Sequence, residues 1–236
     1  MDSSDFKQHY SQQFNTELEE VRSRVLIMGG LVEQQLRLAI DALNRAQSHP
    51  AETVVSNDIK VNTYDVEIDE RCTQILALRK PSASDLRLVL AVIKMTADLE
   101  RIGDEAKRIA QMSLTASNGE ARRNRFGQIA HLGSLVQGML YRALDAFARM
   151  DVDAAIAVAH EDNDIDREYE SIMRQSITLM MEDPRSVPSV MDVIWAARAL
   201  ERIGDRCCNI SEYIIYFVKG KDVRHTSLEQ IRKEFS

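Results

Sequence analysis

The chain has 236 residues, which is enough for one domain or for two small fused domains. With 44% hydrophobic and 28% charged residues, 9 glycines and 4 prolines, its composition favours an all-α fold with a substantial core. The net charge of −7 excludes a general binder of nucleic acid or of anionic membranes. The N-terminus has no apolar signal segment and no apolar run is long enough to span a bilayer, so we expect a cytoplasmic protein.

Prolines and short polar clusters divide the chain into six long helical stretches. The breaks are expected at His49-Pro50, Pro81, Ser117-Asn118-Gly119 and Pro184 to Pro188, because the residue before a proline is disfavoured in a helix and Asn-Gly favours a turn. Ser82 and Ser84 are candidate N-caps for the third helix, and Asp151 is one for the fifth. The predicted helices cover about 6–47, 52–79, 82–114, 123–150, 151–182 and 187–219.

Each half of the chain has three long helices with short connections, as in antiparallel bundles. Gly29-Gly30 interrupts the first helix and indicates a bend or a close helix contact rather than a functional site. The three cysteines, Cys72, Cys207 and Cys208, lack the spacing of zinc ligands and are expected to be reduced thiols.

The pentapeptide Glu-Arg-Ile-Gly-Asp occurs twice, at 100–104 and 201–205. The surrounding helices also match with a shift of 101 positions, and each carries apolar residues at the 4-3-4-3 spacing of a bundle seam. Cys207 then takes the seam position of Ala106, so its expected role is packing. The seam residues are Leu88, Val92, Met95, Leu99, Ile102, Ala106 and Ile109 in the first copy, and Ser189, Val193, Ala196, Leu200, Ile203, Cys207 and Ile210, extended by Ile214 and Phe217, in the second.

The second and fifth helices repeat as well, with a shift of 97 positions. The shift between the third and sixth helices is four positions longer. These four extra residues fall near the Pro184 to Pro188 loop, where insertions are tolerated. We therefore predict two tandem three-helix bundles related by a pseudo-two-fold axis. Their expected ranges are 1–118 and 119–220, followed by a polar tail over 221–236.

Each half contains two carboxylate pairs spaced i,i+4, a spacing that places both members on one helix face. Like charges there repel, so four such pairs on corresponding helices suggest a bound cation. Oxygen-only ligands suit hard cations such as Mg, Mn or Ca, and also iron. We expect the pairs to converge at the edge of a helix contact, with Gly103 and Gly204 permitting close approach. The predicted metal ligands are Asp65, Asp69, Glu100, Asp104, Asp162, Asp166, Glu201 and Asp205.

Other interpretations of these carboxylates compete with metal binding. One is a salt-bridged face, because Arg101 and Arg202 lie inside the pentapeptides and Arg108 stands four after Asp104. Another is a contact with basic residues of a partner, with no obligate metal. A carboxylate-metal enzyme is disfavoured, because we find no Glu-x-x-His ligand pair, no nucleophile with a base and no phosphate-binding loop.

Asp85-Leu86-Arg87 opens the third helix. An acidic residue in a first turn is favoured by the helix dipole, which is sufficient reason for Asp85 to be there. The functional alternative is that Asp85 and Arg87 contact a partner. The sixth helix opens without an equivalent triplet.

These motifs resemble those of the PhoU family of phosphate-signalling regulators, and the resemblance covers nearly the whole chain. It rests on Pro81-x-Ala83-x-Asp85-Leu86-Arg87, on the run from Asp98 to Asp104, on Leu200 to Asp205 followed by Asn209-Ile210, and on Tyr216 to Gly220 with Arg224-His225. The resemblance implies two three-helix bundles and multinuclear metal clusters held on the surface by the eight predicted carboxylates. The ions would be divalent or trivalent: Mg, Mn, Fe or Zn.

The resemblance also implies a non-enzymatic role. Such a protein is a negative regulator that links the ATPase subunit of a phosphate ABC transporter to a membrane sensor histidine kinase and restrains the phosphate-starvation response. It would reach the membrane only through these partners, and we expect a homodimer. One departure concerns the residue four after each pentapeptide, which is Asn209 in the second copy and Arg108 in the first. This difference predicts that the two sites are not fully equivalent.

Overall fold

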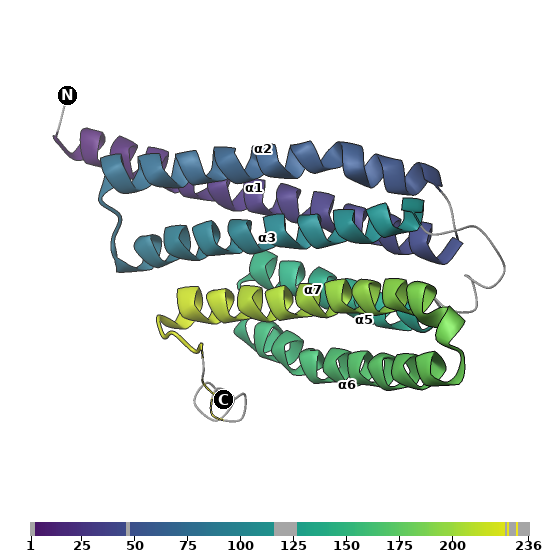
Figure 1. The fold of residues 1–236 in the computed structure, drawn as a ribbon. Coiled ribbons are helices and arrows are strands. Elements are labelled where there is room, and N and C mark those ends of the chain that lie inside the picture. Colours follow the sequence, from purple (N-terminus) through teal and green to yellow (C-terminus); the bar gives the residue numbers. More distant parts are fainter. Residues whose placement is uncertain (1–2, 46–47, 116–126, 225, 227–229, 231–236) are drawn as a thin grey trace.

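A computed structural model describes residues 3–45, 48–115, 127–224, 226 and 230, and almost all of these lie in helices. The helices are much longer than the 11–12 residues typical of globular proteins. Figure 1 shows that they form two units, one above the other in this view, with the helix axes of both units running in roughly the same direction. In chain order they are α1 (Ser3–Arg45), α2 (Ser48–Arg79), α3 (Ala83–Thr115), α5 (Gly127–Arg149), α6 (Val152–Glu182), the short 3-10 helix η1 (Pro184–Ser186) and α7 (Val187–Lys219).

Each unit is a bundle of three helices. The first contains α1, α2 and α3, which all pack on one another, and the second contains α5, α6 and α7, which do the same. The two units meet mainly through α3 and α7, which lie side by side in the middle of the molecule, and through α1 and α5 (Figure 1). The predicted all-α fold of two three-helix units is confirmed.

A reciprocal contact between α1 and α5 reveals the pseudo-two-fold axis. A Cβ placed on Gly29 would lie 2.5 Å from Leu144, and one placed on Gly133 would lie 3.1 Å from Ile40. Gly133 and Leu144 each stand 104 positions after Gly29 and Ile40, so the two contacts exchange equivalent residues. Such an exchange is the signature of a two-fold axis. It also shows that the internal repeat extends to the first helix of each unit, and that Gly29 marks a close helix contact.

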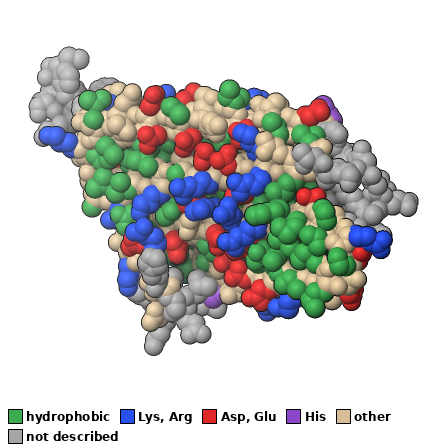
Figure 2. Space-filling model, viewed as in Figure 1, with side chains coloured by type: hydrophobic (Ala, Val, Ile, Leu, Met, Phe, Trp, Pro, Cys, Tyr) green, Lys and Arg blue, Asp and Glu red, His purple; other side chains and the backbone are tan. Residues whose placement is uncertain are grey.

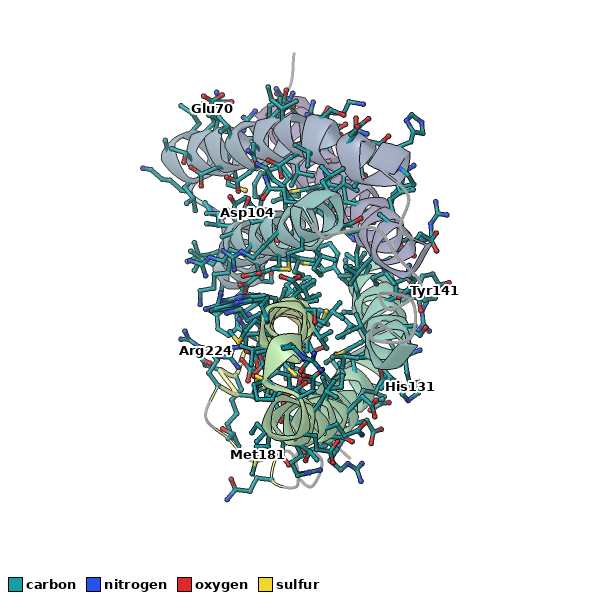
Figure 3. All side chains as sticks on the ribbon, turned by 45° about the vertical axis from the view of Figure 1, so that its right-hand side comes forward. Glu70, Asp104, His131, Tyr141, Met181 and Arg224 are labelled. Carbon is teal, nitrogen blue, oxygen red and sulfur yellow. The ribbon has the colours of Figure 1, made fainter. Side chains whose placement is uncertain are left out.

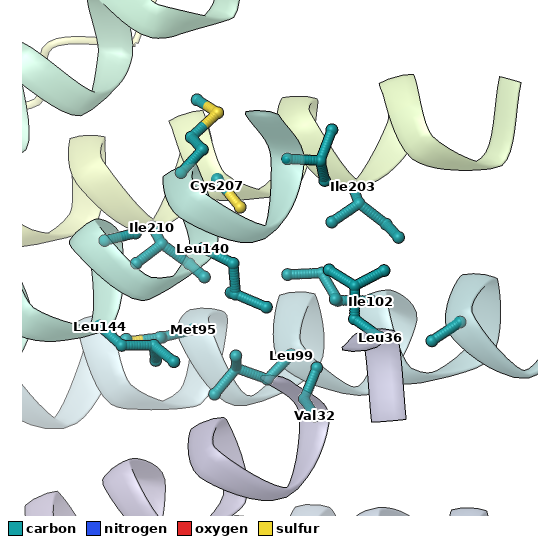
Figure 4. Packing of buried hydrophobic residues seen from close by; sticks show 14 of the residues in the cluster. Val32, Leu36, Met95, Leu99, Ile102, Leu140, Leu144, Ile203, Cys207 and Ile210 are labelled. Carbon is teal, nitrogen blue, oxygen red and sulfur yellow. The ribbon is translucent and has the colours of Figure 1, made fainter. Parts of the chain in front are cut away.

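The hydrophobic core is continuous across both units. Met95, Leu99 and Ile102 of α3 face Val32 and Leu36 of α1 on one side. On the other side lie residues of α5 and α7 (Figure 4). These are Leu140, Leu144, Ile203, Cys207 and Ile210. Because α3 contributes to both packing surfaces, the units share apolar contacts instead of forming two independent cores.

The predicted seam is confirmed, including the assignment of Cys207 to packing. Its residues on α3 are at most 9% exposed, and on α7 those from Val193 to Ile214 are at most 5% exposed. Phe217 at the end of the stripe is half-buried against the core. Cys72 and Cys207 are buried, Cys208 is half-buried, and all three thiols are free.

Helix ends differ from the predictions at two places. Pro50 lies in the first turn of α2 and does not precede it, because the first backbone N–H groups of a helix have no intrahelical partner and proline there removes nothing. At the start of α3, the candidate Ser82 immediately precedes the first helical residue, and its carbonyl accepts from the Leu86 N–H at 2.7 Å, while the other candidate, Ser84, is already helical. Asp151 caps α6 as predicted, with its side chain accepting from the Ala154 N–H at 2.9 Å.

The predicted linker at 117–119 lies outside the described residues. Within the described ranges, no helix combines the length and the apolar character that crossing a membrane would require.

Candidate metal centre

The eight predicted carboxylates lie on four helices, in two clusters that are equivalent by the internal repeat. The first cluster joins α2 to α3 and the second joins α6 to α7. In every pair one carboxylate is half-buried and the other is exposed. Figure 3 shows one of the exposed members, Asp104 of α3. The half-buried members are Asp65, Glu100, Asp162 and Glu201, and the exposed members are Asp69, Asp104, Asp166 and Asp205.

Burial explains this inner and outer arrangement. Asp65 stands one turn before Ile68, which is fully buried, and Glu100 stands beside the fully buried Leu99 and Ile102. The inner carboxylates therefore sit at the rim of the helix contact, while the residue four positions later points further toward solvent.

The first cluster is electrostatically strained. Partial burial raises the pKa of Asp65, and repulsion from Asp69 raises it further. The pKa of Glu100 is raised by partial burial and then by Asp104 and Asp65. The charges of Asp104 and Asp65 thus both act on Glu100, so the α2 and α3 pairs interact electrostatically.

The second cluster shows the same pattern more strongly. Burial raises the pKa of Asp162 to about 6, with further contributions from Asp166 and Asp205. The pKa values of Glu201 and Asp205 are also raised, in both cases mainly by burial. A bound cation would favour the charged forms and relieve this repulsion.

The arginines near the pentapeptides bind other carboxylates. Arg101 and Arg206 contact Asp98, at 3.8 and 3.3 Å, and Arg202 reaches Glu105 of α3 at 3.0 Å. Figure 2 shows a band of Lys and Arg side chains across the middle of the molecule, with acidic side chains on both sides.

Arg108 also contacts Glu105, at 2.9 Å. Within the described part of the chain, Glu201 is the one predicted ligand that forms an ion pair, with Arg198 at 2.6 Å. The salt-bridged face therefore does not account for the clusters. In the described ranges, no basic side chain lies within 4.0 Å of the other seven carboxylates.

The donor atoms fit a hard cation, because all eight predicted ligands are carboxylates. Glu201 supports this fit, since its Oε2 atom is buried and has no hydrogen-bond partner. The side chains nevertheless do not enclose an ion as they stand. Among the described residues, no three Asp, Glu, His or Cys side chains converge closely enough to form a ligand shell. Binding would therefore bring the carboxylates together by rotamer changes, with water completing the shell.

Both pentapeptide glycines lie in close helix contacts, as predicted. A Cβ on Gly204 would stand 3.2 Å from Ile165 and 3.3 Å from the Asp162 Oδ1 atom. A Cβ on Gly103 would stand 3.3 Å from the Gln35 Oε1 atom. Each glycine thus lets a polar oxygen approach the helix that carries the carboxylates.

Sequence reasoning missed two buried polar residues behind the first cluster. Asp58 of α2 is 4% exposed and accepts a 2.6 Å hydrogen bond from Lys107 of α3 at one oxygen, while its other oxygen has no partner. Gln35 of α1 is also 4% exposed, and neither polar atom of its side chain has a partner. The signal available in the sequence was positional, because a polar residue at a core position of a bundle helix calls for an explanation.

The structure gives Asp85 and Arg87 intramolecular partners. The Ser82 hydroxyl donates to the Asp85 carboxylate at 2.7 Å, so Asp85 belongs to the first-turn arrangement of α3. Arg87 donates to the Phe217 carbonyl at 3.4 Å and lies against Gly220, at the end of α7. A contact of either residue with a partner stays a prediction.

Comparison with known proteins identifies the family. The PhoU domain matches twice, over residues 25–113 and 129–214. The chain belongs to the PhoU family. It is 50% identical over 227 residues to the phosphate-specific transport system accessory protein PhoU homolog of Pseudomonas aeruginosa, covering 96% of this chain and 93% of that protein. It is 47% identical over 233 residues to the phosphate-specific transport system accessory protein PhoU of Escherichia coli, covering 99% of this chain and 96% of that protein.

Solved PhoU structures share the fold. The crystal structure of PhoU from Pseudomonas aeruginosa matches with a TM-score of 0.83 at 47% identity, covering 88% of this chain and all of that one. The phosphate transport system regulatory protein PhoU from Streptococcus pneumoniae matches with a TM-score of 0.80 at 31% identity, covering 89% and 99%. The duplicated helical unit is thus the PhoU architecture.

The difference between Asn209 and Arg108 has a structural role in this PhoU family member. Asn209 donates to Asp98 at 3.3 Å, and the Tyr213 hydroxyl donates to the same carboxylate at 2.9 Å. Asn209 therefore belongs to the contact between α7 and α3. The departure from symmetry at this position accompanies the contact with Asp98, whose equivalent in the second repeat is Ala199.

Proposed function

We propose that the chain is a regulatory accessory protein of phosphate-specific transport, located in the cytoplasm and acting as a negative regulator of phosphate uptake and of the phosphate-starvation response. The observation that carries this proposal is identity of about 50% over nearly the full length to proteins named for that role. A regulatory role also agrees with the site, whose carboxylate clusters lie on helix surfaces.

We infer that metal ions support this role. The eight carboxylates, Asp65, Asp69, Glu100 and Asp104 in the first cluster and Asp162, Asp166, Glu201 and Asp205 in the second, would hold them. An ion would supply positive charge that offsets the repulsion within each cluster. Because each cluster draws on two helices, an occupied site would also tie α2 to α3, and α6 to α7. Metal loading would thereby fix the shape and the charge of two outer surfaces.

The adaptor role requires partners, and we propose the ATPase subunit of the phosphate ABC transporter and the phosphate sensor histidine kinase. Affinity purification of the tagged chain from cells grown in high phosphate, followed by mass spectrometry, is expected to recover both. The same purification with light-scattering analysis tests the proposed homodimer. Recovery of neither partner from cross-linked cells would count against the adaptor.

A deletion strain tests the regulatory role itself. Loss of the gene is expected to switch on a phosphate-responsive reporter in high phosphate, and the wild-type chain supplied in trans is expected to restore repression. A deletion strain that keeps the reporter repressed would overturn the proposal.

A second candidate is a helical scaffold without obligate metal, in which the clusters contact basic surfaces of partners. Two observations on the described residues favour it: seven of the carboxylates form no ion pair, and no three potential ligand side chains converge around an ion. Metal analysis of the purified protein separates the candidates. Bound ions that disappear in a Glu100→Gln, Asp104→Asn, Glu201→Gln, Asp205→Asn variant support the metal-binding protein, and their absence from the wild-type chain supports the scaffold.

A further inference from the structure

The two carboxylate clusters differ in the basic residue that stands three positions before the glutamate. In the second cluster this residue is Arg198, whose guanidinium contacts the Glu201 carboxylate at 2.6 Å. The equivalent residue of the first cluster is Ala97, and Glu100 has no such partner. The second cluster thus contains a guanidinium that the first lacks.

Arg198 also contacts an aromatic ring of the neighbouring helix. Its guanidinium lies over the Tyr169 ring of α6, 5.9 Å from the centroid. Cys72 occupies the position of Tyr169 in the first repeat, so the stacking platform is missing there together with the arginine. A cation fixed both by a carboxylate and by an aromatic face keeps its place better than a free surface arginine.

The other basic residues near the two clusters do not remove this difference between them. Arg202 and Arg206 act on Asp205 from a distance, while their close contacts are with Glu105 and Asp98 of α3. At the first cluster, Arg101 acts on Glu100 in the same distant way.

Lys107, the other cation near the first cluster, is bound to Asp58, so the two charges form a pair of their own. Of all these cations, Arg198 is therefore the one in direct contact with a cluster carboxylate.

The interior behind the two clusters differs as well. Gln35 and Asp58, both 4% exposed, leave polar atoms without partners behind the first cluster, and the Gln35 Oε1 atom points at Gly103 of the pentapeptide helix. Met139 and Ala155 stand at the equivalent positions of the second repeat, and both are fully buried and apolar. At these two positions the first cluster is backed by polar side chains with unpartnered atoms, and the second by apolar side chains.

We propose that the clusters are unequal cation sites, that the first is the tighter site for a hard divalent ion, and that Arg198 is a built-in counter-ion that competes with metal at the second. This inference rests on the proposed metal-binding function. Loading the second site would require the guanidinium to leave Glu201. The protein would therefore fill in two steps as the ion concentration rises, the α2–α3 surface first and the α6–α7 surface later.

Calorimetric titration of the full-length, chelator-treated chain with Mn²⁺ tests the order of filling. We expect two classes of site whose dissociation constants differ by about tenfold or more, since a unit charge in contact with a partly exposed ligand has an effect of this order. The variant Glu100→Gln/Asp104→Asn is expected to lose the tight class. The variant Glu201→Gln/Asp205→Asn is expected to keep the tight class and lose the weak one.

The role of Arg198 is tested in the chain that retains only the second cluster. Adding Arg198→Ala, which copies Ala97, is expected to tighten Mn²⁺ binding by about tenfold. Arg198→Lys keeps the charge and is expected to tighten it much less. Arg174→Ala serves as the matched control, because Arg174 lies on the same pair of helices and contacts Glu170 outside the cluster.

Each result decides between distinct conclusions. Equal affinities, loss of the tight class with the second cluster, or no effect of Arg198→Ala would overturn the inference and leave metal binding intact. Mn²⁺ binding by none of the chains, with circular dichroism showing that they are folded, would overturn the proposed metal function together with this inference.

Discussion

The two PhoU repeats are alike on the outside and different within. Each presents four carboxylates in the same inner and outer order on its second and third helices. Behind them the first repeat buries Gln35, Asp58 and part of Lys107, whereas the second has Met139, Ala155 and Cys208. The comparison shows that a duplicated surface can be retained while the residues behind it change. The proposed difference in cation affinity between the two clusters is one consequence that can be tested.

Substitutions in the shared core are expected to have the largest effect on stability, and they test whether the two repeats unfold together. Leu36 and Leu140 are equivalent and fully buried, so replacing either with alanine is expected to cost about 3 kcal/mol of unfolding free energy. Because α3 packs against both units, chemical denaturation of either variant should show one transition at a lower denaturant concentration. Two separated transitions would show that the units unfold independently and would contradict the continuous core.

The ion pair between Lys107 and Asp58 in the first repeat provides the next test. Lys107→Met leaves the Asp58 carboxylate buried without its partner, and we expect a loss of about 2 kcal/mol, reduced from the value for a fully buried pair because Lys107 is one-third exposed. Asp58→Ala/Lys107→Met gives this position the apolar character of the second repeat and is expected to recover most of that loss. Lys60→Met, on the exposed side of α2, should change stability little. A double variant no more stable than the single one would show that the pair is needed for packing.

The raised pKa of Asp162 predicts how stability depends on pH. The pKa of this carboxyl is about 6 in the folded chain and close to 3.9 when unfolded. The folded state therefore binds more protons between these values, and the contribution of Asp162 to stability is present below pH 4 and lost as pH rises through 6.

Denaturation in chelator tests this dependence. At pH 7 we expect Asp162→Asn to be more stable than the wild type by about 1 kcal/mol, after allowance for solvent screening, and the gain to vanish at pH 4. Asp164→Asn is the control, because Asp164 is exposed and pairs with Arg167. A gain that is the same at both pH values would show that repulsion and burial at Asp162 are not its cause.

The sequence was sufficient to predict what depends on periodicity and repetition. Two copies of one pentapeptide led to the duplicated fold, and the 4-3-4-3 stripe placed Ile102, Ile203 and Cys207 in the core, where the structure has them. These inferences succeed because a helical period fixes which face a residue occupies.

Contacts between distant elements could not be predicted in the same way. The sequence placed Arg101 and Arg202 beside the motif carboxylates. Arg101 contacts Asp98 within α3, whereas Arg202 of α7 contacts Glu105 of α3, a partner that depends on how the two helices pack. Arg198 over Tyr169 joins residues of different helices that no local pattern connects. Periodicity gives the face of one helix, while the register between two helices depends on the side chains of both.

The smallest expected effect separates the two adjacent glycines of α1. A Cβ at Gly30 would meet nothing within 4 Å, so Gly30→Ala is expected to stabilise the chain by roughly 0.5–1 kcal/mol through helix propensity. A Cβ at Gly29 would stand 2.5 Å from Leu144, which must shift within the contact between the units, so Gly29→Ala should gain nothing or lose stability. Thermal unfolding should place the two variants a few degrees apart, Gly30→Ala above the wild type and Gly29→Ala at or below it. Equal melting temperatures would show that Leu144 repacks freely, and the reciprocal glycine contact would then contribute little to holding the two repeats together.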